Sequence, residues 1–421
     1  MTIDAAIIDF SAALLLRYFK RGDTHESVAP RVEHQRDLDL LKAHWAISKP
    51  VRDLVGYLLT HPHETQSLLT MRTRVDDAVA RGRIDARRTW LYRLQSGLPT
   101  AMIALEPVRS FNTGSNLLLA WVLREAATYT ARLSGWQGPT SPYFEVIERA
   151  QGEMRAVQRL EALRDPLRAV TIGQRPRAGA VRSAARSRRQ VYRLAVDAYT
   201  LLQGIEQGNP TAIDRVARSA LIGPLEDWRR FELAVGLAVG EALASALNTP
   251  LQISLLGGNT AAPIVTAGRF SIYWQNRTPL YTAPELEPSE VLTRKILTAF
   301  NLSIGNDRPD LIVLDQMAEQ VVAIVEVKYV AGDTSSGRFR EAVDQVVRYA
   351  RGYAPPGATG PILARSLVAI SRDAPVIADL SADVLGSVDF AGIMRNELFA
   401  WAARLVGAPL PSPVLSEPLS A

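Results

Sequence analysis

The sequence has no cysteine among its 421 residues. That absence excludes disulfide bonds and zinc sites built on thiolate ligands, and it fits a protein of the reducing cytoplasm, where we expect this one to be. Long apolar runs are missing too. A membrane helix needs about 20 consecutive apolar residues. The best stretch, residues 233–247, is shorter and contains Glu241, so it predicts a core helix and no membrane partner.

Two further absences concern export and nucleotides. No basic segment precedes an apolar one at the N-terminus, so we expect no signal peptide. A phosphate-binding loop of the form Gly-x-x-x-x-Gly-Lys-Ser/Thr is absent as well. We therefore do not expect this chain to hydrolyse nucleotides itself.

Lysine is scarce. The chain has 48 lysines and arginines together, and its only lysines are Lys20, Lys42, Lys49, Lys295 and Lys328. The net charge of +5 and the isoelectric point of about 9.5 give a mild preference for polyanions. A hydrophobic fraction of 47% is ordinary for a globular protein, and the length predicts two or three domains.

Charged residues border two apolar segments in the C-terminal half. Asp310 precedes the apolar residues 311–314, while Glu326 and Lys328 end the apolar run that begins at Val321. Such runs predict strands buried on both faces. Alternate side chains of a strand share a face, so Glu326 and Lys328 should point the same way. Buried charges are costly unless they are compensated, and a divalent metal with a phosphate would compensate them.

If the two strands pair, Asp310 and Glu326 converge on one ion. Carboxylate oxygens suit Mg²⁺ or Mn²⁺, which would polarise a phosphate ester and lower the pKa of a bound water. Lys328 would orient that water or stabilise developing charge. A compact ammonium group differs from a planar guanidinium, and its use at this position in an arginine-rich chain favours a specific role.

The helix expected after these strands supplies two more candidates. Val343, Val346, Val347 and Ala350 share one face and should pack on the sheet, and the other face carries Glu341, Gln345, Arg348 and Tyr349. Gln345 and Tyr349 are four residues apart. We therefore expect both to reach the same phosphate or metal-bound water.

Together, Pro309-Asp310, Glu326-x-Lys328 and Gln345-x-x-x-Tyr349 resemble the PD-(D/E)xK nuclease superfamily, in the version that carries a Gln-x-x-x-Tyr motif. The resemblance implies a C-terminal α/β restriction-endonuclease-like domain, a central mixed sheet flanked by helices. It also implies catalytic roles for all five residues, and metal binding by Asp310 and Glu326. A βαβ unit with a surface Glu/Lys pair, or an inactivated nuclease fold, is the alternative.

The domain organisation follows from this placement. We predict a mixed, mainly helical domain over residues 1–135, an arginine-rich segment of long helices over 136–215, the nuclease domain over 216–407 and a disordered tail over 408–421. In the first of these, residues 72–85 predict a helix that Gly82 ends. In the nuclease domain, residues 225–247 predict the first helix and 388–406 a terminal helical region.

The superfamily often adds an acidic residue from its first helix to the metal site. Glu226 and Glu232 are candidates, and Glu290 lies on a later helix. Leu225-Glu226-Asp227-Trp228 resembles the aromatic-Glu-x-Trp start of related nuclease domains, with leucine in place of the aromatic residue. The sequence leaves all three open, and this segment favours Glu226.

An arginine cluster lies between residues 175 and 193, and no acidic residue occurs from Pro166 to Val196. On a single helix over residues 181–202, Arg182, Arg186, Arg189 and Arg193 would share one face. That face would bind DNA phosphates. The alternative is a solvated helix face without a partner.

The overall layout resembles McrC, the nuclease subunit of McrBC-type restriction systems. The resemblance lies in Asn112-Thr113-Gly114-Ser115-Asn116-Leu117-Leu118, in the long helices that end at residues 192–202, and in the Leu225–Trp228 segment. It implies a Mg²⁺- or Mn²⁺-dependent DNA endonuclease of a prokaryotic defence system, working with a separate AAA-type NTPase. A non-catalytic DNA-binding or assembly subunit and a nuclease acting on RNA or a transposon end remain alternatives.

Overall fold

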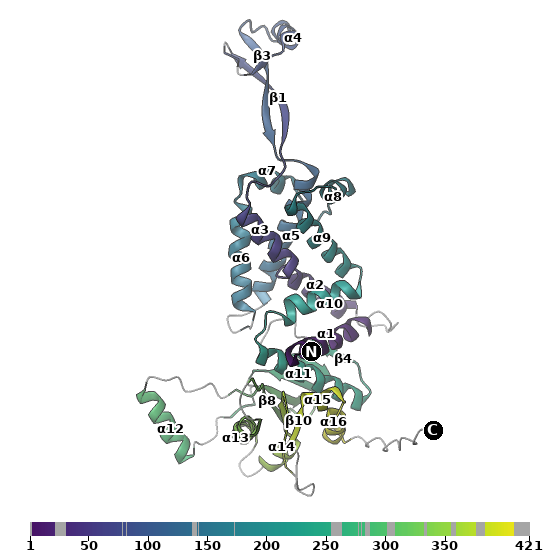
Figure 1. The fold of residues 1–421 in the computed structure, drawn as a ribbon, viewed down its shortest axis with the longest axis vertical. Helices are drawn as coiled ribbons and strands as arrows, with labels where there is room; N and C mark the ends of the chain where they lie inside the picture. The colour runs from purple at the N-terminus through teal and green to yellow at the C-terminus, as the bar shows by residue number, and fades with distance from the viewer. Residues whose placement is uncertain are drawn as a thin grey trace, which may run out of the picture. The chain divides into compact units, whose positions relative to one another are not determined.

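The computed structural model describes residues 2–21, 31–77, 79–80, 82–136, 141, 143–171, 173–253, 263–276, 278, 280–282, 287–300, 308–331, 335–354, 359–375 and 384–407. They form two compact units, each assembled from separated segments (Figure 1). The sheet unit contains residues 1–41, 133–145 and 208–421, and the second unit contains residues 42–132 and 146–207. No helix in the described part of the chain is long and apolar enough to cross a membrane.

Within its described residues, the sheet unit is built on a mixed sheet of seven strands in the order β10-β9-β8-β7-β6-β5-β4. Neighbouring strands from β4 to β8 run antiparallel, whereas β8, β9 and β10 run parallel. The strands are β4 (Leu251–Ile253), β5 (Val265–Ala267), β6 (Phe270–Trp274), β7 (Leu311–Asp315), β8 (Gln320–Lys328), β9 (Leu367–Ile370) and β10 (Gly386–Asp389). Strands β7 and β8 are central and buried on both faces, which explains their apolar sequences.

Helix α11 (Asp227–Leu247) covers one face of this sheet, and its glycines explain how closely it packs. A Cβ atom on Gly236 would come within 2.9 Å of Ile264 Cδ1, and one on Gly240 within 2.4 Å of Val265 Cγ1. The two glycines are one turn apart and therefore face the sheet together. They let the helix axis lie closer to the strands than larger residues would.

Helix α13 (Ser335–Tyr353) covers the other face together with α14 (Thr359–Arg365). Ile312 of β7 belongs to the buried cluster under α13, whereas the preceding Leu311 lies beside Gly236 of α11. Consecutive residues of a strand point to opposite faces, so the two helices enclose the central strands between them. The polar site described below lies at the ends of β7 and β8.

The N-terminal helix α1 (Ile3–Arg21) belongs to the sheet unit and packs against α11. Arg17 pairs with Glu241 of α11 at 2.8 Å. The hydroxyl of Tyr329, directly after β8, donates to Asp4 Oδ1 at 2.5 Å. The remaining helices of this unit are α10 (Pro210–Val216), the π-helix η1 (Ala217–Ile222), α12 (Pro288–Ala299), α15 (Phe390–Met394) and α16 (Leu398–Val406).

The second unit combines helices with a small antiparallel sheet in the order β1-β3-β2. Helices α2 (Arg31–Trp45), α5 (Gly114–Trp136) and α6 (Phe144–Gln158) contribute residues to both units. The other elements are α3 (Lys49–Thr60), β1 (Leu68–Asp77), β2 (Arg83–Ile84), α4 (Ala86–Ser96), β3 (Ala101–Ser110), α7 (Glu161–Ala169), α8 (Ala178–Ala185) and α9 (Gln190–Glu206). Strands β1 and β3 project from the helices of their own unit (Figure 1).

Several elements differ from the sequence predictions. The helix predicted over residues 72–85 is wrong, because residues 68–77 form a strand paired along its whole length with β3. Gly82 serves the hairpin: its φ is +102°, and a Cβ atom there would lie 2.6 Å from the Leu105 carbonyl oxygen. The terminal helical region predicted over 388–406 begins with the last two residues of β10 and continues as two short helices. The predicted tail lies outside the described residues.

The domain prediction also differs from the two units. Three consecutive domains were expected, yet α1 lies with residues 208–421 and not with the region that follows it in sequence. Amphipathic helices show which face is apolar but not which partner covers it. The packing of α1 against α11 is therefore a tertiary contact that the periodicity of the sequence could not predict.

Candidate active site

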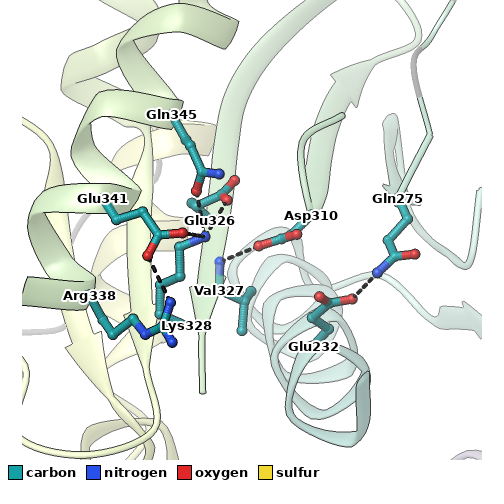
Figure 2. A network of polar contacts seen from close by, with 9 residues as sticks. All are labelled: Glu232, Gln275, Asp310, Glu326, Val327, Lys328, Arg338, Glu341 and Gln345. Carbon is teal, nitrogen blue, oxygen red and sulfur yellow. Dashed lines mark hydrogen bonds and ion pairs between the residues drawn. The ribbon is translucent and has the colours of Figure 1, made fainter. Parts of the chain in front are cut away.

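Pairing of β7 with β8 brings Asp310 to the end of β8. The two strands are antiparallel with Leu311 opposite Val325, so Asp310, just before β7, lies near Glu326 and Val327 (Figure 2). The backbone amide of Val327 donates to Asp310 Oδ2 at 2.8 Å. This is the convergence that the sequence indicated for the two carboxylates.

Lys328 lies at the centre of a polar cluster between β8 and α13. Its ammonium group donates to Glu326 Oε1 at 3.0 Å and to Gln345 Oε1, and it lies 3.6 Å from Glu341 Oε1. Figure 2 shows the three acceptors around the nitrogen. The Lys328 side chain is 13% exposed and that of Glu326 only 2%. The ammonium is therefore fixed by its partners at the edge of the solvent.

Helix α13 places its two candidate residues differently from expectation. Gln345 contacts Lys328, as its position predicts. Tyr349, expected beside it on the polar face, is 2% exposed and belongs to the buried cluster, whereas Val347 is 40% exposed. The buried stripe is rotated relative to the predicted one, because a tyrosine ring is large enough to replace a valine in the core. Burial, followed by the charge of Glu326, raises the pKa of Tyr349.

Glu232 of α11 is the third carboxylate of the site and is buried like Glu326, whereas Asp310 is half-buried. Only 3% of Glu232 is exposed. Its Oε2 atom accepts hydrogen bonds from Trp274 Nε1 at 2.6 Å and from Gln275 Nε2 at 2.7 Å. Both donors come from the end of β6, next to β7. The charge of Asp310 acts on Glu232 and raises its pKa, so the two carboxylates are electrostatic neighbours.

The structure thus corrects the choice of Glu226. That residue precedes the first turn of α11, its side chain is 63% exposed, and it lies 3.7 Å from Arg229. Glu290 accepts from the Glu287 amide at the start of α12. A sequence signal for Glu232 did exist: it precedes Gly236 and Gly240 by one and two turns, and those glycines mark the face of α11 that meets the sheet.

Burial raises the pKa of each carboxylate of the site. Burial and the charge of Asp310 raise the pKa of Glu232 to about 8. Burial raises the pKa of Asp310, and burial together with Asp310 raises the pKa of Glu326 well above its ordinary value. Burial lowers the pKa of Lys328, but Glu326 and Asp310 outweigh it, and the result lies above the ordinary value. The single positive charge of Lys328 is therefore outnumbered by three acidic side chains, so the site has an excess of acid.

This excess fits a divalent cation. Glu326 Oε2 is buried and has no hydrogen-bond partner among the described residues, and such an orphaned acceptor is normally satisfied by an ion or water. Within the described residues, no three acidic, histidine or cysteine side chains already enclose an ion position. Mg²⁺ commonly takes one or two protein carboxylates and completes its shell with water and substrate phosphate. Asp310 and Glu326 match that requirement.

The arginine cluster is arranged differently from the predicted single helix. Helix α8 ends at Ala185 and α9 begins at Gln190, so the four predicted DNA-binding arginines do not share one helix face. Arg189 donates from its guanidinium to the carbonyl oxygens of Glu64 and Thr65 at 2.7 and 2.8 Å. Its contacts are structural. All four arginines, Arg182, Arg186, Arg189 and Arg193, are exposed.

Sequence reasoning missed the residues that surround the acids. Trp274 and Gln275 hold Glu232, Arg308 donates to Gln275 Oε1 at 2.8 Å, and Glu341 lies beside Lys328. Trp274 ends β6, and Gln275 follows it directly. Nothing in the sequence showed that this strand is the neighbour of β7.

Comparison with known proteins adds little. No family model matches the sequence, and no curated protein matches it. Among solved structures, the chain is similar to one from a refined half-complex of a tetradecameric assembly of Thermococcus gammatolerans McrB AAA+ hexamers with bound McrC. That alignment covers 91% of this chain and 70% of the other, with 10% identity and a TM-score of 0.25. Likeness at this level carries no argument about function.

Proposed function

We propose that the protein is a Mg²⁺- or Mn²⁺-dependent endonuclease that hydrolyses phosphodiester bonds of DNA. The observation that carries this proposal is the meeting of Asp310, Glu326 and Lys328 at the end of two buried strands, with an orphaned carboxylate oxygen among them. Buried acids of this kind are expensive for a fold to keep. A catalytic metal centre would explain why the protein has acids at these positions.

Asp310 and Glu326 would hold the metal, and Glu232 is the acid from the first helix. When bound, the ion supplies Lewis-acid stabilisation of the phosphate and a lowered pKa for its water. The restriction-endonuclease-like assignment of the seven-stranded mixed sheet belongs to the same proposal. It rests on these residues and on their order along β7, β8 and α13.

Lys328 acts as a cation in this scheme. Its raised pKa keeps the ammonium protonated at neutral pH, so it serves as a donor and not as a proton acceptor. Glu326 and Gln345 take two of its three N–H groups. Held in this way, the ammonium can stabilise negative charge that develops on the phosphate without first reorganising. Gln345 positions Lys328, and Tyr349 supports α13 from the core.

The biological setting is proposed on the sequence resemblance alone. A McrC-like layout points to a prokaryotic restriction or anti-phage system in which a separate AAA-type NTPase works with this subunit. The exposed arginines Arg182, Arg186 and Arg193 would contact nucleic-acid phosphates, and the choice of DNA as the substrate rests on the McrC-like layout.

Cleavage of a supercoiled plasmid tests the proposal. Purified protein is incubated with Mg²⁺ or Mn²⁺, and wild type is compared with Lys328→Ala and with the matched control Lys295→Ala, which alters an exposed lysine on α12. We expect wild type and control to cleave and Lys328→Ala to be slower by about a hundred-fold or more. Equal cleavage by all three proteins would reject the site. If none cleaves alone, the comparison is repeated in the presence of the proposed AAA-type NTPase partner.

A further inference from the structure

Gln275 connects the solvent-exposed edge of the candidate site to its buried acid. Its side-chain amide donates to Glu232 Oε2 at 2.7 Å, and its carbonyl oxygen accepts from the exposed Arg308 at 2.8 Å. The three side chains therefore form one chain of hydrogen bonds from solvent to the carboxylate. Figure 2 shows its inner part, the contact of Gln275 with Glu232.

The backbone of Gln275 is held in an uncommon conformation. Its φ is +49°, in the left-handed region that non-glycine residues seldom adopt. Its amide donates to the Asp310 carbonyl oxygen at 2.7 Å, which fixes the turn against β7. A side chain kept at such a position costs of order 1–3 kcal/mol and persists only where the surroundings impose it. Strain of this kind often accompanies a functional constraint.

One carboxylate oxygen of Glu232 is already held by protein donors. Its Oε2 atom is occupied by Trp274 and Gln275, and the described residues contain no preformed group of three ligands. Two carboxylates, Asp310 and Glu326, are available without rearrangement. If the Gln275 contact opened, only Trp274 would still hold Glu232 Oε2, and the carboxylate could turn more easily towards the other two.

We propose that Arg308, Gln275 and Glu232 form a substrate-sensing latch that completes the metal site only when DNA is bound. Arg308 binds a backbone phosphate beside the scissile one, because a guanidinium prefers an anionic acceptor to the neutral amide oxygen that it contacts in the structure. Gln275 then loses its outer partner and releases Glu232. The freed carboxylate turns to the ion held by Asp310 and Glu326. Gln275 is a positioning residue in this scheme, and Arg308 is the phosphate ligand.

This inference rests on the proposed nuclease function. It predicts that loss of the Gln275 side chain raises metal affinity, where a decrease is the ordinary result. Removing a hydrogen-bond partner of a metal ligand ordinarily lowers metal affinity by about 10- to 100-fold. If Gln275 is a latch, Gln275→Gly instead raises the Mn²⁺ affinity of DNA-free protein, by about ten-fold for one hydrogen bond to a charged group. Glycine is suited to the left-handed backbone, so the variant should fold at least as well as wild type.

Calorimetric titration of Mn²⁺ into the full chain, with and without a short duplex DNA, tests the latch. For wild type, we expect DNA to raise the affinity. Gln275→Gly should have the higher affinity without DNA, and a second change, Glu232→Gln, should remove that gain. Arg308→Gln removes the outer partner of Gln275, so its DNA-free affinity should rise above that of wild type, and adding DNA should raise it no further.

Two outcomes would overturn the inference, and they can be told apart. A lower Mn²⁺ affinity in Gln275→Gly would leave the metal site standing and show that Gln275 only supports Glu232. Failure of wild type to bind Mn²⁺ under either condition would remove the proposed nuclease site and the latch with it.

Discussion

The buried acid Glu232 should destabilise the metal-free protein at alkaline pH, and Glu232→Gln should relieve this. Both hydrogen bonds from Trp274 and Gln275 go to a single oxygen, Oε2, which the amide oxygen of glutamine can replace. The substitution therefore keeps shape and acceptor while it removes the charge. A Glu→Gln change at an unpaired surface position would have little effect on stability.

The sign and size of this change in stability with pH follow from the pKa of Glu232. Burial and Asp310 raise the pKa of Glu232 from 4.5 to about 8. A raised folded-state pKa means that the folded state holds the proton more tightly, so this contribution is complete below pH 4.5 and is lost as pH rises through 8. Between about pH 6 and about pH 9 the loss is roughly 2.5 kcal/mol. The neutral glutamine does not contribute to this loss.

Urea unfolding in the presence of a chelator measures this difference. The free energy of unfolding of the wild-type sheet unit should fall more steeply from pH 6 to pH 9 than that of Glu232→Gln. Glu226→Gln is the matched control, because Glu226 precedes the same helix with an exposed side chain. It should follow wild type. The reasoning is refuted if Glu232→Gln and wild type lose stability in parallel over this range.

Three other predictions concern the metal, the site helix and the arginines. Mg²⁺ should raise the melting temperature more at pH 9 than at pH 6, because it binds the deprotonated carboxylates; equal shifts would argue against a carboxylate site. Gln345→Ala removes one of the partners of Lys328 and should slow plasmid cleavage by about ten-fold, less than loss of the ammonium itself; an unchanged rate would deny Gln345 a positioning role. Arg189→Ala should lower the free energy of unfolding by about 1 kcal/mol, because its contacts with two carbonyl oxygens are lost. Arg193→Ala should leave the calorimetric melting temperature unchanged. It should reduce the slope of DNA affinity against salt concentration, on logarithmic scales, by about one unit. Identical behaviour of the two variants would contradict this division.

The parts of the site that the sequence predicted depend on short-range rules. Alternation along a strand put Glu326 and Lys328 on one face, and helical spacing put Gln345 within reach of them. The structure agrees on both points. The family assignment and the roles of these residues remain predictions until cleavage is measured.

The parts that could not be predicted depend on which elements meet. Helical periodicity alone cannot choose between Glu226 and Glu232, because the choice depends on where α11 contacts the sheet. Tyr349 lies in the core because that core accepts its ring. The helix predicted over residues 181–202 breaks between Arg186 and Arg189, where Ser187 Oγ accepts the Arg189 amide at 3.3 Å. Serine side chains compete for backbone groups in this way, but periodicity does not reveal when they do.

The place of α1 has a consequence for the order in which the chain can fold during synthesis. Its partner α11 lies about two hundred residues further along, so α1 leaves the ribosome long before the surface that it covers exists. The second unit, whose segments lie between them, can complete its own contacts first. Contacts so distant in sequence form slowly, and domains generally fold as units during translation. The apolar face of α1 therefore stays exposed to solvent, or bound by a chaperone, until the sheet unit has been synthesised.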